Sequence, residues 1–112
     1  MADLPTPPEH LSQSSREWWA SVLRDYSLEP HHLRLLQAAA ESWDRFQQAR
    51  ETIARDGLTV PTADGGLKAH PCVAIERDSR LAFARLLREL DLDCGSPTDT
   101  TRPPALASNR RI

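Results

Sequence analysis

The chain is short of aromatic residues, of net charge and of long apolar runs, and each shortage excludes a class of protein. Aromatic residues are 5% of its 112 residues, so one small domain with a thin core is expected. A formal net charge of −2 does not fit a monomer that binds nucleic acid through overall basicity. No apolar run is long enough to span a bilayer and no signal-peptide pattern opens the chain, so no membrane partner is expected.

The two cysteines, Cys72 and Cys94, are not expected to form a disulfide. If one helix separates them they lie about 30 Å apart, whereas a disulfide needs Cα atoms within about 7 Å. The chain also lacks Cys-x-x-Cys and His-x-x-x-His spacings, a P-loop glycine pattern and a nucleophile elbow. The sequence therefore predicts no metal, no cofactor, no catalytic residue and no enzymatic activity.

What the chain does contain is helical periodicity in three segments. Apolar residues recur at three- and four-residue steps after Trp18, which is typical of an amphipathic helix. Pro30 and Gly57 are typical first and C′ residues of a second helix, and Pro71 restarts the helical pattern. These patterns predict helices over about 13–26, 30–56 and 71–92.

The segment "LTVPTADGGLKAH" interrupts this pattern between the second and third helices. Asp64, Gly65 and Gly66 form a turn signal flanked by short strand candidates, so a β-hairpin-like insert is expected over 58–70. Both ends of the chain are rich in proline and polar residues and lack helical spacing. The predicted organisation is a flexible arm over 1–11, a helical oligomerisation domain over 12–94 and a flexible tail over 95–112.

The fold class that follows is mainly α. The short connection before Pro30 predicts that the first two helices pack as an antiparallel helical hairpin, with the third long helix added to it. The third helix carries one apolar stripe for this core and a second, weaker stripe that includes Val73, Ala84 and Leu87. The second stripe needs another partner, for which a further copy of the chain is expected.

The third helix also carries several arginines. Arginine suits bidentate pairing with carboxylate or phosphate, although a coding bias gives the same composition. Lys68 and His70 stand just before the helix N-terminus, whose amides favour anions. The alternative to a phosphate-binding ridge is a surface neutralised by Glu76, Asp78 and Glu89. The candidate DNA-contacting residues are Lys68, His70, Arg77, Arg80, Arg85 and Arg88.

Trp18 and Trp19 point to adjacent faces of the first helix. One ring is expected in the core, and the other either at the core edge or exposed as an anchor for a partner. The C-terminal tail adds further positive charge. The candidate partner-binding residues are Trp18, Trp19, Arg102, Arg110 and Arg111.

The order of these elements resembles the small terminase subunits of tailed bacteriophages. It is most similar to a branch in which a Gly…Lys-x-His/Asn-Pro segment precedes the last helix and a Leu-Gly-Leu-like stretch followed by proline ends it. The resemblance covers about residues 11–97. The matching residues are Gly65 or Gly66, Lys68, His70 and Pro71, and then Leu90-Asp91-Leu92 followed by Ser96-Pro97.

The chain departs from this family pattern at two points. Asp91 stands where the family often has glycine, which bears on the end of the last helix. No arginine follows Pro97 directly, and Arg102 is the nearest substitute. The second departure leaves the role of the tail arginines open.

The resemblance implies a non-catalytic subunit that assembles into a ring and recognises double-stranded viral DNA. It also implies a partner, the large terminase subunit, which supplies ATPase and nuclease, and a location in the cytoplasm of the bacterial host. The alternative hypothesis is a small helical adaptor or regulator that binds protein through Trp18 and Trp19 and never contacts DNA. A monomeric helix-turn-helix repressor is disfavoured because the body of the chain is weakly acidic and has no basic recognition helix.

Overall fold

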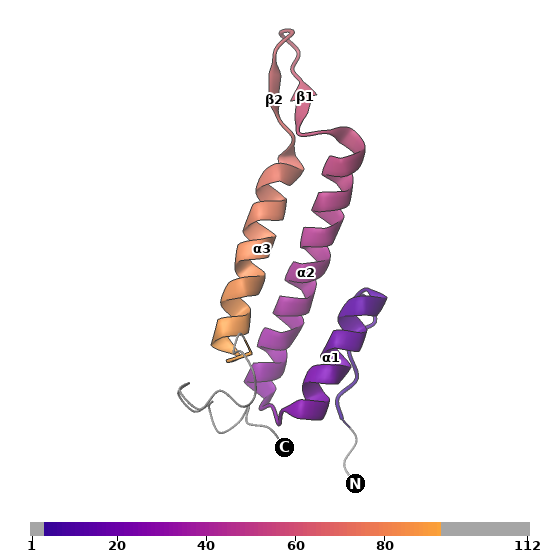
Figure 1. The fold of residues 1–112 in the computed structure, drawn as a ribbon, viewed down its shortest axis with the longest axis vertical. Coiled ribbons are helices and arrows are strands. Elements are labelled where there is room, and N and C mark those ends of the chain that lie inside the picture. The colour runs from indigo at the N-terminus through magenta and orange to yellow at the C-terminus, as the bar shows by residue number, and fades with distance from the viewer. Residues whose placement is uncertain (1–3, 93–112) are drawn as a thin grey trace.

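The computed structural model describes residues 4–92, which form helices and one β-hairpin (Figure 1). α2 and α3 lie side by side and antiparallel, the hairpin projects beyond one end of this pair, and α1 packs against α2 near the other end. The predicted fold class, mainly α with a short hairpin insert, is confirmed. The elements are α1 (Gln13–Asp25), α2 (Pro30–Asp56), β1 (Thr59–Pro61), β2 (Leu67–Ala69) and α3 (Pro71–Glu89).

Local capping explains the ends of α1 and α2. Pro30 occupies the first turn of α2, and Gly57 ends it with a φ of 89°, a conformation that glycine adopts without a steric penalty. α1 stops one residue before its predicted end because Tyr26 is already extended, with φ −132° and ψ 146°. The short loop before Pro30 sets α1 antiparallel to α2, although the more extensive packing is between α2 and α3.

The C-terminal end of α3 also differs from its prediction, because the helix stops before residue 92. Asp91 takes a φ of 59°. Its N–H donates to the carbonyl of Arg88 at 3.0 Å, and the N–H of Leu92 donates to the carbonyl of Leu87 at 2.8 Å. These two bonds define a Schellman motif, in which the left-handed position is usually glycine. Asp91, at the position where the resemblance pattern often has glycine, therefore forms the helix stop in this chain.

Replacing Asp91 by alanine and by glycine should separate the backbone cost of this stop from the contribution of the side chain. Both variants lose the carboxylate, but only alanine keeps a Cβ in the left-handed conformation. The free energy of unfolding of D91G should exceed that of D91A by about 1 kcal/mol. Urea titrations at one protein concentration measure this difference. Equal stabilities would contradict this account of the helix end.

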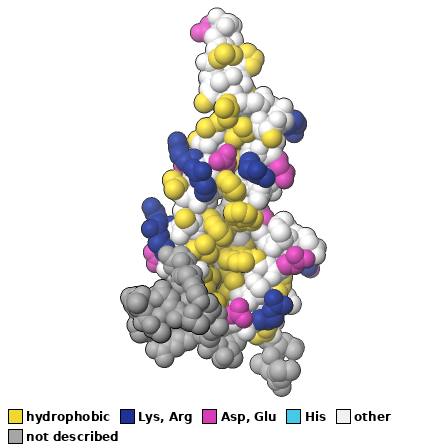
Figure 2. Space-filling model, in the orientation of Figure 1, with side chains coloured by type: hydrophobic (Ala, Val, Ile, Leu, Met, Phe, Trp, Pro, Cys, Tyr) yellow, Lys and Arg dark blue, Asp and Glu magenta, His cyan; other side chains and the backbone are white. Residues whose placement is uncertain are grey.

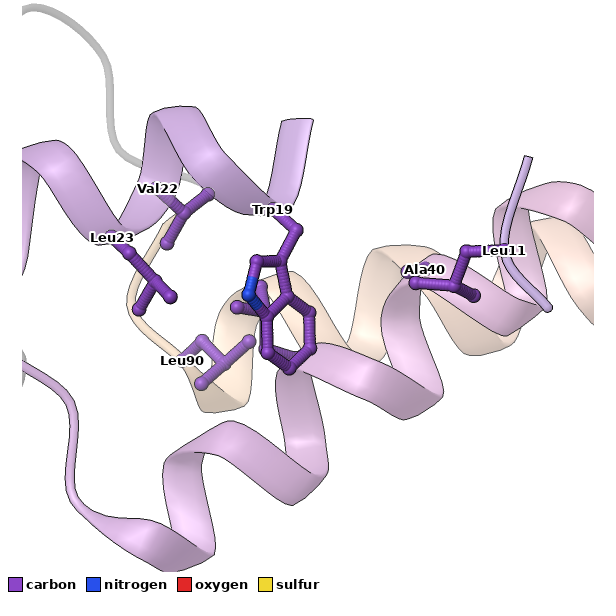
Figure 3. Packing of buried hydrophobic residues seen from close by; sticks show 7 residues of the cluster. Leu11, Trp19, Val22, Leu23, Ala40 and Leu90 are labelled. Carbon is purple, nitrogen blue, oxygen red and sulfur yellow. The ribbon is translucent and has the colours of Figure 1, made fainter. Parts of the chain in front are cut away.

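The buried core lies where α1, the first half of α2 and the end of α3 meet (Figure 3). Leu36 and Leu90 have no exposed area. No residue between Pro71 and Glu89 is buried, so the part of α3 next to the hairpin keeps its apolar side chains partly open to solvent. The core cluster consists of Leu11, Trp19, Val22, Leu23, Leu36, Ala40 and Leu90.

The described residues before α1 pack against the helices, in contrast to the predicted flexible arm. Leu11 is buried. The indole Nε1 of Trp19 donates to the carbonyl of Pro5 at 3.2 Å, and His10 Nε2 lies 2.6 Å from Glu41 Oε2. The composition of this segment predicted an arm, because the side chains that bind it, Trp19 and Glu41, lie on α1 and α2 and not in the segment itself.

Candidate nucleic-acid interface

The outer face of α3, turned away from α2, carries the four arginines predicted to contact DNA. At about 100° per residue, Arg77, Arg85 and Arg88 fall within about 80° of one another, and Arg80 lies at the edge of this group. All four side chains are exposed. Figure 2 shows Lys and Arg side chains along the edge of the molecule where α3 runs. The four residues form one arginine ridge about 16 Å long.

This arginine ridge is mostly unpaired. Arg77 Nε lies 3.1 Å from Asp78 Oδ1, and both side chains are more than half exposed. No carboxylate of residues 4–92 lies within ion-pair distance of the other three arginines, so Glu76 and Glu89 do not neutralise the ridge as the alternative interpretation required. Exposed guanidinium groups without a carboxylate partner can bind phosphate in the bidentate manner that arginine favours.

Lys68 and His70 lie apart from the arginine ridge. Lys68 is exposed on β2, opposite Val60. His70 is the N-cap of α3: its Nδ1 accepts from the Cys72 N–H at 3.0 Å, and its Nε2 lies 3.1 Å from Asp56 Oδ2. Because Nδ1 accepts, the ring proton lies on Nε2 and is donated to Asp56. His70 has only 10% of its side chain exposed, so it joins α2 to α3 and presents no free nitrogen.

This arrangement explains the His-Pro pair before the last helix. Hydrogen bonds from Arg55 and from His70 lower the pKa of Asp56 to about 2, so its carboxylate is charged and accepts both. Pro71 then takes the first position of α3, where its missing N–H costs nothing. Asparagine, the family's other residue at the histidine position, is also a strong N-cap. The motif fixes the junction between hairpin and helices.

Trp18 and Trp19 have different surroundings. Trp19 is 4% exposed and belongs to the core. Trp18 is half-buried at the wall of a cavity of about 240 Å³, with its ring centroid 5.7 Å from that of Phe83. The ring centroid of Trp43 lies 5.2 Å from that of Phe83. This aromatic cavity is lined by Ser14, Ser15, Trp18, Trp43 and Phe83.

The sequence interpretation missed a polar cluster that fixes the start of α1 on α2. Asp44 Oδ2 accepts from the Ser12 N–H at 2.7 Å, and its Oδ1 accepts from the hydroxyl groups of Ser12 and Ser15, each at 2.6 Å. Partial burial raises the pKa of Asp44, but these hydrogen bonds outweigh it and hold the pKa below its ordinary value. Ser12 also caps α1, since its hydroxyl accepts from the Ser15 N–H at 3.2 Å, but the carboxylate that both serines bind lies about thirty residues away on α2.

Some predicted residues lie outside the described part of the chain. These are residues 1–3 of the predicted arm, the last two residues of the predicted helical domain and the tail over 95–112, including Arg102, Arg110 and Arg111. Within residues 4–92, no group of three His, Cys, Asp or Glu side chains is placed to hold a metal ion. None of the helices in that same range combines the length and the apolar character needed to cross a membrane.

Two long helices pack antiparallel, with a β-hairpin at one end, the core at the other and the arginine ridge along one edge. This arrangement is a small helical module with little enclosed interior. The chain belongs to the phage terminase small-subunit family, whose model, described as "Phage terminase, small subunit", matches residues 16–105. The match confirms the resemblance read from the motifs, and members of this family are generally non-catalytic. No match was found among curated proteins or among solved structures.

Proposed function

We propose that the chain is the small terminase subunit of a tailed phage or prophage, and that it acts as a non-catalytic ring. The ring recognises double-stranded viral DNA in the bacterial cytoplasm and passes it to the large terminase subunit, which supplies ATPase and nuclease for packaging. Family membership supports the packaging role. The absence of any buried residue between Pro71 and Glu89 supports assembly, because a long helix this open to solvent gains from a neighbouring copy.

The single observation that carries DNA contact is the arginine ridge, in which only Arg77 has an ion-pair partner among residues 4–92. A guanidinium group binds phosphate bidentately and releases condensed counterions from the duplex. One copy, with a net charge of −2, offers only a local positive edge. Repetition of that edge around a ring adds the fields of successive subunits and gives a continuous track for the phosphate backbone.

Replacement of Arg77, Arg85 and Arg88 by glutamine should weaken duplex binding and flatten its salt dependence. Each phosphate contact contributes about 0.9 to the slope of log K against log salt concentration, so the slope should fall by about 3 for each engaged subunit. Fluorescence anisotropy with labelled duplex DNA over a salt series measures both affinity and slope.

A matched control replaces Arg16, Arg34 and Arg50, which are exposed on α1 and α2, by glutamine. It has the same net charge as the ridge variant, but its affinity and slope should stay close to those of the unmodified chain. Equal losses in the two variants would mean that net charge alone matters and would reject the ridge as the contact. Binding by the unmodified chain that does not change with salt would reject phosphate contact altogether.

The aromatic cavity favours a second candidate function, a protein-binding adaptor that does not contact DNA. Trp18 lines this cavity whereas Trp19 is buried, so a protein partner would meet Trp18 and not the pair. A fixed stoichiometric complex with a protein partner, together with no salt-sensitive DNA affinity, would select the adaptor.

A further inference from the structure

Two exposed apolar features of the chain are too far apart to meet within one copy. One is the β-hairpin and the other is the aromatic cavity. Phe83, at the cavity, lies about 18 Å along α3 from Pro71, and the hairpin extends from Pro71 in the opposite direction (Figure 1). A hairpin that reaches this cavity must therefore come from another copy.

The hairpin has one uncharged face. Residues directly opposite each other in an antiparallel pair point to the same side, so the pairs Thr59↔Ala69 and Pro61↔Leu67 form one face, and all four side chains are exposed. Leu67 is 72% exposed, the highest fraction among the large hydrophobic side chains of the described residues. Lys68 points to the opposite side and has no ion-pair partner within residues 4–92.

The surface beside the aromatic cavity is acidic. Ser14 lines both this cavity and a neighbouring hollow of about 460 Å³. That acidic hollow contains the carboxylates of Asp44 and Glu51, neither of which has an ion-pair partner among the described residues. An apolar cavity and an anionic hollow thus lie side by side, separated by one serine.

We infer that β2 of one copy docks over Ser14 of a second copy, with Leu67 in the aromatic cavity and Lys68 in the acidic hollow. Charge complementarity selects this occupant, because an exposed leucine followed by a lysine without an ion pair matches an apolar cavity next to two carboxylates. Among residues 4–92 neither carboxylate has a cationic partner, although Asp44 accepts hydrogen bonds from Ser12 and Ser15. No Lys or Arg lines either hollow, and the one histidine of the acidic hollow, His10, has its Nε2 2.6 Å from Glu41 Oε2, so a phosphate backbone does not fit there. Lys68 then serves subunit contact in place of the DNA contact expected from the sequence.

This inference rests on the proposed ring and specifies how its subunits meet. Each copy offers one hairpin and one pair of hollows, so the contact runs head to tail and can repeat until the ring closes. The hairpin and the cavity are separated by more than about 18 Å along the helices. Neighbouring subunits are consequently staggered, and the ring closes with its helices inclined to the ring axis.

A charge swap tests the contact on the full chain. Lys68→Glu should raise the protein concentration at the midpoint of assembly at least about tenfold, and combination with Glu51→Lys should restore assembly. Both side chains are exposed and without ion pairs in residues 4–92, so neither change threatens the fold. Leu67→Asp should also dissociate the oligomer. Light scattering behind a sizing column, over a concentration series, measures the native mass.

Two control substitutions sharpen the result. Glu89→Lys, an exposed glutamate on α3, should not restore the Lys68→Glu variant, and Leu81→Asp, 57% exposed on the outer face of α3, should leave the mass unchanged. If the native mass corresponds to several subunits and neither Lys68→Glu nor Leu67→Asp changes it, the contact is overturned and the proposed function stands. A monomer at every concentration would overturn the ring and the contact together. A dimer that Leu67→Asp dissociates would support the contact and overturn the ring.

Discussion

Trp19→Ala should lower the free energy of unfolding by about 3–5 kcal/mol, the cost expected for removal of a large buried aromatic ring. The indole is 4% exposed in the core between α1 and α2, and its Nε1 holds the carbonyl of Pro5. Truncation leaves a cavity and frees the segment before α1. Since small domains have stabilities of about 5–15 kcal/mol, the loss is a large share of the total. Urea titration followed by far-UV circular dichroism, at one fixed protein concentration, measures it.

Trp18→Ala is the matched control. Its ring is half-buried and lines the aromatic cavity, so its removal should cost only about 1–2 kcal/mol, from the lost contact with Phe83 and partial re-exposure. Equal destabilisation by the two substitutions would contradict the placement of Trp19 in the core and of Trp18 at its edge.

Asp44→Ala should lower the free energy of unfolding by about 2–4 kcal/mol near pH 7, because hydrogen bonds to a charged acceptor contribute about 1.5–3 kcal/mol each and are not additive. The carboxylate accepts from Ser12 and Ser15 and ties the start of α1 to α2. Urea titrations of both proteins measure the loss. Asp78→Ala, which removes an exposed carboxylate with only a surface ion pair, should change stability by less than about 0.5 kcal/mol.

The same substitution should change how stability depends on pH. The pKa of Asp44 is lower in the folded chain than its ordinary value, so the folded state binds this proton less readily than the unfolded state. Its contribution is therefore complete above the unfolded pKa of about 3.9 and is lost as pH falls through the lower folded value. The stability difference between the unmodified chain and Asp44→Ala should shrink as the pH is lowered below about 4. A difference that does not shrink as the pH falls below about 4 would contradict the role of the carboxylate.

Local signals were sufficient for much of the fold. Pro30 and Gly57 act on their own turns of chain, and α2 has the predicted bounds. Asp64 accepts from the Thr62 hydroxyl and from the Gly66 N–H, so the turn of the hairpin was also readable from neighbouring residues. The end of α3 could not be predicted from neighbouring residues. Aspartate enters the left-handed conformation much less readily than glycine, so Asp91 is a weak sequence signal for a helix end.

The candidate site was less predictable because it depends on contacts between distant parts of the chain. The sequence placed His70 beside the arginines, yet its ring is engaged by Asp56 across the hairpin and by the first turn of α3. Helical spacing suggested that Glu76 and Glu89 could pair with nearby arginines, but the side chains do not meet. The Asp44 cluster joins two helices through residues about thirty positions apart, a separation that no local pattern encodes.

The distribution of indole rings gives the molecule a built-in optical reporter. No tryptophan or tyrosine follows Trp43, so intrinsic emission carries no signal from the hairpin of the same subunit. Trp18 and Trp43 instead line the cavity where the hairpin of a neighbour is inferred to dock, while Trp19 is shielded in the core. Filling of that cavity would change the polarity around Trp18 and Trp43, and the emission of the shielded Trp19 would serve as an internal reference. Assembly could then be followed in real time without any label.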